Sequence, residues 1–161
     1  QVAVSVKAAS VSPVRVLGLT VESITMNNLL GSLDYRLGSK VWSSKGEANV
    51  NNAVEFNKFD NAVSVDAAHT SKPPKIVLPL SGSELQFTIK LKVKYDKKGN
   101  GTEEWGDFTF HATARKTFLP GMSYSFEFTL KFFGDFKETE LTLGILEFTE
   151  IKNVTDPVGG E

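Results

Sequence analysis

The sequence contains no cysteine and only two histidines in 161 residues. Without a thiol there can be no cysteine nucleophile, no disulfide framework, and no zinc or iron–sulfur site built on cysteine. The net charge of −1 shows no excess of basic residues, so we expect no nucleic-acid partner. No apolar run approaches the length of a membrane-spanning helix, so we also predict no transmembrane helix.

Patterns typical of catalytic sites are missing as well. There is no G-x-S-x-G nucleophile motif and no Gly-Lys-Ser/Thr phosphate loop. His111 falls on the polar face of a predicted strand, and His69 lies in a predicted loop near Asp66. Two isolated histidines do not supply the three or four ligands that zinc needs. We therefore expect no catalytic residues, no cofactor and no metal site, and we predict that the protein is not an enzyme.

A long alternation of apolar and polar residues stands out between Leu85 and Tyr95. Its odd positions are apolar, and its even positions are polar and include Lys90, Lys92 and Lys94. A period of two predicts a strand with one buried and one exposed face. We interpret the lysines, with Lys97 and Lys98 of the next loop, as residues that keep a long strand soluble and discourage unwanted edge pairing.

Weaker patterns predict strands over most of the remaining chain. An N-terminal strand is predicted at residues 2–6, and residues 27–35 are predicted to form a turn and a return strand. One helical turn is an alternative for residues 49–59, and a change of phase predicts a bulge near Gly144. Residues 38–53 are expected to form a loop or short edge strands. The other expected strands or strand-bearing segments are residues 14–26, 54–80, 108–115, 124–132 and 141–148.

These patterns predict one all-β domain over residues 1–161. Strands with one apolar face must cover each other in pairs, which favours an antiparallel β-sandwich of seven to nine strands. We expect a Greek-key-like, transthyretin-like arrangement, with a barrel as the alternative.

The two tryptophans, Trp42 and Trp105, are the candidate ligand-facing aromatics. Three acidic residues, Glu103, Glu104 and Asp107, surround Trp105 in the sequence. An aromatic beside carboxylates is what a sugar site would offer, whereas the structural interpretation is the solvated tip of a hairpin. One hypothesis for the chain is therefore a carbohydrate-binding module of a secreted or surface glycan-utilisation protein.

Five stretches of the chain are similar, in order and spacing, to segments of one bacterial family. They are "QVAVSVKA" (1–8), "TVESITMNNLLGSLDY" (20–35), "KIVLPLSGSELQFTIKLKVKY" (75–95), "FLPGMSYSFEFTL" (118–130) and "LEFTEIKNVTDPVGG" (146–160). Together they resemble the Bacteroidetes fimbrillin-like pilus subunits, the FimA/Mfa type. Leu80 stands where that family often has Gln, Met122 stands where it commonly has Lys, and the Trp common in its closing segment is missing.

The resemblance implies a structural or adhesive subunit of a surface pilus, secreted to the fimbrium or outer membrane of an anaerobic bacterium. It implies that the chain is the C-terminal domain of a longer precursor. Its partners would be other pilus subunits, joined by β-strand exchange, and a host or glycan ligand. We expect one end, Val2–Lys7 or Leu146–Val154, to provide an exchangeable strand. An enzyme with an unrecognised site is the remaining hypothesis.

Overall fold

The computed structural model describes residues 1–10, 15–39, 41–44, 47–60, 67–78, 80–96, 99–119, 122–134 and 141–151. These residues form ten strands and no helix, which confirms the all-β class and excludes the helical turn expected at residues 49–59. The count exceeds seven to nine because four of the strands are only two to four residues long. The strands are β1 (Val2–Ser10), β2 (Arg15–Asn27), β3 (Leu33–Arg36), β4 (Val41–Ser44), β5 (Val54–Phe56), β6 (His69–Thr70), β7 (Leu80–Asp96), β8 (Glu104–Phe118), β9 (Tyr124–Gly134) and β10 (Leu141–Ile151).

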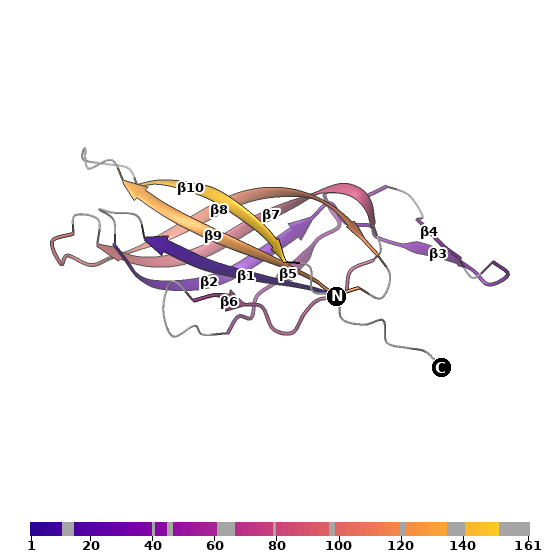
Figure 1. Ribbon diagram of the computed structural model, residues 1–161, viewed down its shortest axis with the longest axis horizontal. Coiled ribbons are helices and arrows are strands. Elements are labelled where there is room, and N and C mark those ends of the chain that lie inside the picture. Colours follow the sequence, from indigo (N-terminus) through magenta and orange to yellow (C-terminus); the bar gives the residue numbers. More distant parts are fainter. Residues whose placement is uncertain are drawn as a thin grey trace.

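Eight of the described strands form two four-stranded sheets that pack face to face (Figure 1). One sheet has the order β10-β9-β1-β6 and the other β5-β2-β7-β8, while β3 and β4 form a separate hairpin. The predicted β-sandwich is confirmed, and the alternative of a barrel is wrong because the two sheets do not close on each other. Among the described residues, no helix is long and apolar enough to cross a membrane.

Strand β1 lies inside its sheet and runs parallel to β9. The register is continuous from Val2 opposite Tyr124 to Ser10 opposite Phe132. On its other side β1 pairs with the two residues of β6. The Lys7 ammonium also reaches the Glu127 carboxylate at 2.6 Å. The sequence predicted mostly antiparallel pairing, and this parallel pair joins residues too far apart for local patterns to reveal it.

Two bulges adjust strand β2 to its neighbour β7. The pairing register shifts between Val16 and Gly18 and again between Val21 and Ser23. Each shift adds one residue, so the buried positions of β2 are spaced by three as well as by two. The buried side chains of β2 are Val16, Leu19, Val21, Ile24 and Met26.

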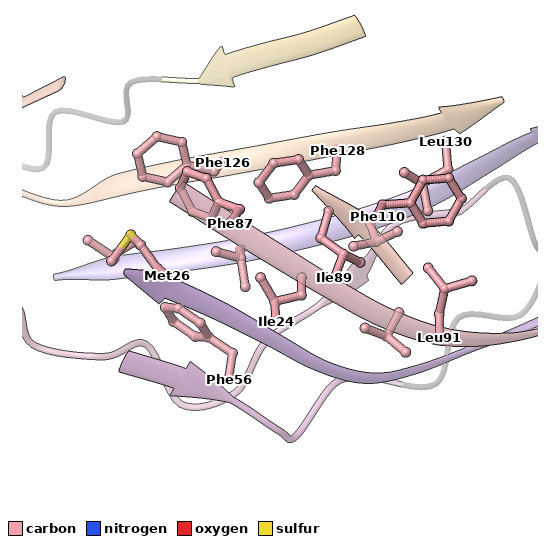
Figure 2. Packing of buried hydrophobic residues seen from close by; sticks show 14 of the residues in the cluster. Ile24, Met26, Phe56, Phe87, Ile89, Leu91, Phe110, Phe126, Phe128 and Leu130 are labelled. Atoms are coloured by element: carbon pink, nitrogen blue, oxygen red, sulfur yellow. The ribbon is translucent and has the colours of Figure 1, made fainter. Parts of the chain in front are cut away.

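The core lies between the two sheets and is rich in phenylalanine (Figure 2). Phe87 of β7 packs against Phe126 and Phe128 of β9, with ring centroids 5.2 and 5.1 Å apart. The odd positions of Leu85–Val93 are fully buried, as the alternation predicts, and Tyr95 is partly buried. This face of β7 therefore anchors one sheet to the other.

Two sequence interpretations need correction. Residues 27–35 do not return along the preceding strand, because β3 pairs with β4 and β2 pairs with β5 and β7. The lysines of β7 do not prevent edge-to-edge pairing, because β7 is a central strand between β2 and β8.

The bulge predicted near Gly144 is confirmed, since the β9–β10 register shifts between Ile145 and Glu147. Lys97 and Lys98 fall outside the described residues.

Candidate functional site

Trp105 lies on the outer face of the sheet formed by β5, β2, β7 and β8. It occupies the second position of β8, where it pairs with Lys94 of β7, and Lys94 pairs in turn with Gly18 of β2. The three residues thus form one row across three strands. Trp105 is 60% exposed, although it belongs to a regular strand rather than to a loop tip.

Gly18 lies next to the far end of the indole. A Cβ atom placed on Gly18 would lie 3.1 Å from Cβ of Lys94 and 3.6 Å from Cη2 of Trp105. Strands β8 and β2 are separated by a whole strand, about 10 Å at the usual spacing. The far edge of the indole reaches Gly18 across that distance only if the ring lies along the sheet. The side chain therefore extends across β7 towards Gly18, and most of its surface stays exposed.

Charged side chains surround this aromatic surface and pair with one another. Lys94 forms an ion pair with Glu103, which directly precedes β8. Two residues before Lys94 on β7, Lys92 lies 3.4 Å from Glu22 and 4.0 Å from Asp107. The acidic residues near Trp105 thus do not converge on one point as a glycosidase pair would. Glu103 pairs with Lys94, whereas Glu22 and Asp107 flank Lys92. The register partners of Lys92 on the neighbouring strands are Thr20 and Asp107.

The structure does not bring the two predicted aromatics together. Trp42 belongs to β4 and pairs with Tyr35 in the β3–β4 hairpin, and its side chain falls outside the described residues. That hairpin projects from the end of the molecule opposite the β7–β8 loop (Figure 1). Two exposed tryptophans on one flat face would have favoured a carbohydrate-binding module. Trp42 and Trp105 belong to different sheets, so this arrangement is not present.

The two histidines occupy different environments. His111 is exposed on the outer face of β8, as predicted, and its Nδ1 lies 3.3 Å from the Thr88 hydroxyl. His69 was expected in a loop, but it belongs to β6, pairs with Val6 and is buried. The difference arises because β6 is a two-residue strand that exists through its pairing with β1. Asp66, the predicted neighbour of His69, falls outside the described residues.

The His69 ring has one polar atom without a partner. Its Nε2 is buried and makes no hydrogen bond. Burial lowers the pKa of His69, and a hydrogen bond to the backbone of Asp60 opposes this in part. The neutral form of the ring is therefore favoured, because the loss of hydration destabilises the charged imidazolium more than the single backbone hydrogen bond stabilises it.

A shallow hollow lies beside His69. Its volume is about 320 Å³, and it is lined by Leu19, Thr20, Val21, Asn57, Lys58, Phe59, Asp60 and His69. The Asp60 carboxylate already forms an ion pair with Lys72 at 2.9 Å. Backbone hydrogen bonds also join residues 58–60 to residues 70–72. Because Nε2 itself is buried, the ring does not present this atom to the hollow. Within the described residues, no group of three or more potential metal-ligating side chains occurs here or elsewhere.

Sequence reasoning found Trp105 but missed the residues that orient it. A glycine inside a strand pattern marks a bulge or a close approach, and Gly18 in "VLGLTV" carries that signal. Nothing in the sequence connects Gly18 to Trp105, because the row depends on the registers of two strand pairs. The burial of His69 has no signal in the sequence.

Among the described residues, these features define an all-β sandwich that exposes Trp105 on the outer face of one sheet. Neither a family model nor a curated protein matches the sequence. A solved structure with a similar fold is that of a candidate cell adhesion protein from Bacteroides fragilis, with a TM-score of 0.54 and 15% sequence identity. The match covers 98% of this chain and 46% of the other, so this chain spans about half the length of that protein. At this identity the likeness establishes the fold alone.

Proposed function

We propose that the chain is a structural or adhesive subunit of a bacterial surface pilus, of the fimbrillin-like kind. It would be displayed at the fimbrium or outer membrane and would join other subunits by β-strand exchange. Two findings support this proposal. The fimbrillin-like stretches run in order over nearly the whole sequence. The fold resembles that of a Bacteroides fragilis protein whose description concerns cell adhesion.

The observation that carries strand exchange is the position of β1. Its inward side chains Val2, Val4, Val6 and Ala8 are all buried in the core. Its whole length pairs with β9 in parallel. In β-augmentation, backbone hydrogen bonds give affinity and alternate side chains fill pockets. Strand β1 offers both, so the same strand of another subunit could take its place.

Of the two segments predicted to exchange, β1 is the stronger candidate. Its other neighbour, β6, has only two residues, so few ladder bonds beyond those to β9 oppose its release. The C-terminal candidate is represented by β10, an edge strand paired with β9. Residues 152–154 of that candidate fall outside the described residues.

Cysteine pairs can test the exchange cleanly because the chain has no cysteine of its own. Ser5 and Glu127 are register partners in the β1–β9 ladder. Cα atoms of such partners lie within the range that a disulfide can bridge. We expect a mixture of Ser5→Cys and Glu127→Cys chains to form a disulfide-linked heterodimer under conditions that promote assembly. We expect the double variant to lock β1 within its own subunit and to stop assembly.

A register control accompanies this experiment. Thr129→Cys in place of Glu127→Cys moves the thiol two residues along β9, away from Ser5. It should give little cross-linking with Ser5→Cys. Assembly without the Ser5–Glu127 cross-link would contradict exchange of β1 and would direct attention to β10.

We also propose that the chain has no catalytic activity, since its sequence lacks the motifs of hydrolases and nucleotide-binding enzymes. Screening the purified chain against chromogenic esters, glycosides and phosphates tests this. Turnover that is lost on His69→Ala or His111→Ala would contradict it.

A further inference from the structure

The indole of Trp105 is a 60% exposed aromatic surface that extends across β7. Its Cη2 atom lies within van der Waals distance of a Cβ position on Gly18, in the row that joins Gly18, Lys94 and Trp105. An aromatic side chain supported in this way loses less conformational freedom when a ligand stacks on it than a flexible side chain would. Such a ring suits a partner that is itself flat and weakly polar on its faces.

The next row along the strands supplies hydrogen-bonding groups beside the ring. Lys92 of β7 pairs with Thr20 of β2 and Asp107 of β8, and its ammonium group also lies 3.4 Å from the Glu22 carboxylate. A separation of two residues along a strand is about 6.8 Å. This is comparable with the width of a pyranose ring, so a sugar stacked on Trp105 would place its hydroxyls over these carboxylates and the ammonium group.

The polar surface continues along β7 and β8 beyond this row. Lys90 pairs with Thr109, Thr88 with His111, and Gln86 with Thr113, all with their side chains on the outer face. Hydroxyl, amide and imidazole groups both donate and accept hydrogen bonds, as sugar hydroxyls do. A linear chain of sugars could therefore follow the strands away from Trp105.

The ion pairs decide between neutral and charged ligands. Lys92 and Lys94, the two lysines nearest the indole, are already paired with Glu22, Asp107 and Glu103. An acidic polysaccharide would have to displace these carboxylates and would meet repulsion from them. A neutral ligand can instead accept hydrogen bonds from the lysines and donate to the carboxylates without breaking the pairs.

We propose that the outer face of β2, β7 and β8 binds a chain of neutral pyranose sugars, with Trp105 as its stacking platform. The inference rests on the proposed adhesive function and names the ligand class for it. Trp105, Lys92 and Asp107 contact the glycan, while Gly18 acts as a positioning residue that lets the indole lie along the sheet.

Calorimetry and a glycan array with the full chain test the proposal. The neutral probes are oligosaccharides of glucose, mannose, galactose and N-acetylglucosamine, and the acidic probes are hyaluronan and heparin oligosaccharides. We expect at least one neutral series to bind in the micromolar to millimolar range, with little dependence on salt. Trp105→Ala should weaken this binding about tenfold or more, and Trp105→Tyr should retain much of it.

Two further variants separate a binding role from a change in folding. Gly18→Val should also weaken binding although Trp105 is unchanged in sequence, because the valine methyl groups would extend beyond a Cβ position that already lies 3.6 Å from Cη2 and would displace the indole. Leu37→Ala is the matched control, since Leu37 is 83% exposed on the β3–β4 hairpin, far from the site. It should leave binding unchanged, and thermal unfolding midpoints should verify that every variant is folded.

Three outcomes would overturn the proposal. They are no binding to any neutral probe, binding that Trp105→Ala does not weaken, and loss of self-association in place of sugar binding on Trp105→Ala. The last would make this face a contact between copies. The Ser5–Glu127 cross-linking test does not involve Trp105, so a failure of sugar binding can be told apart from a failure of pilus assembly.

Discussion

The ring of Phe87 on β7 packs against the ring of Phe126 on β9, with centroids 5.2 Å apart and planes inclined by 52°. This contact joins the two sheets at the centre of the core. Phe87→Ala should lower the free energy of unfolding by about 3–5 kcal/mol, since it removes a fully buried ring and leaves a cavity. Denaturant titration measures the loss.

Lys92→Ala on the opposite face of the same strand is the matched comparison. Its ion pairs with Glu22 and Asp107 are exposed, and exposed pairs contribute at most about 1 kcal/mol. We expect a change of about half a kcal/mol. Equal losses for Phe87→Ala and Lys92→Ala would contradict the assignment of the two faces.

Gly106 should tolerate no side chain. A Cβ atom at this position would lie 2.8 Å from Cζ of Phe108 and 3.3 Å from Cε1 of Tyr95. Gly106→Val should therefore destabilise the protein by about 1–3 kcal/mol, because the Phe108 ring must move. Gly38→Ala provides the control, since a Cβ atom there meets nothing within 4 Å. A midpoint for Gly106→Val that matches Gly38→Ala would show that the Phe108 ring is not fixed.

Asp96 should hold the β7–β8 loop in shape. Its buried carboxylate accepts hydrogen bonds from the backbone N–H of Asn100 at 3.2 Å and of Gly101 at 2.7 Å. Gly101 has a φ of 87°, a conformation that favours glycine. Asp96→Ala would leave these donors without their acceptor and should cost about 1–3 kcal/mol.

Hydrogen exchange can locate the effect of Asp96→Ala. We expect faster exchange at Asn100 and Gly101, with little change in β9. Asp96→Asn should recover part of the loss because its amide oxygen still accepts one bond. Unchanged exchange at both amides would argue against a role for the carboxylate in the loop.

His69 should make stability depend on pH. Burial lowers its pKa in the folded state below the unfolded value of about 6.5. The unfolded chain therefore binds the proton more readily, and stability is full above that value and falls as the pH drops through the folded pKa. Urea titrations between about pH 8 and about pH 5.5 should show the decline.

Variants of the two histidines identify the responsible ring. His69→Asn should flatten the pH dependence in this range, while His111→Ala should preserve it because His111 is exposed. A decline that persists unchanged in His69→Asn would place the titrating group elsewhere.

Strand β7 could be predicted because its signal is local. Each apolar residue of Leu85–Val93 faces the core, and no bulge interrupts this stretch, so the alternation in the sequence equals the alternation in space. The buried face of β2 is harder to predict, since its two bulges, at Leu17 and Glu22, change the phase of the apolar–polar alternation. Local periodicity identifies a strand, but it does not show which residues are bulged, because the bulges depend on the pairing register with the neighbouring strand.

The arrangement of the strands could not be predicted from local patterns. The parallel pairing of β1 with β9 and the pairing of β6 with β1 depend on contacts between distant segments. For the same reason His69 was assigned to a loop. Trp105 could be singled out as an aromatic beside acidic residues, but the Gly18–Lys94–Trp105 row follows from two registers that the sequence does not display.

The parallel pairing of β1 also bears on how the protein is made. Lys7 and Glu127 are 120 positions apart, so the apolar residues of β1 leave the ribosome long before their partner strand exists. Folding with such distant contacts is slow, and an unpaired apolar strand is prone to aggregate. A chaperone or export factor that shields Val2–Ala8 during synthesis would raise the yield of folded protein more than one that binds the later hairpins.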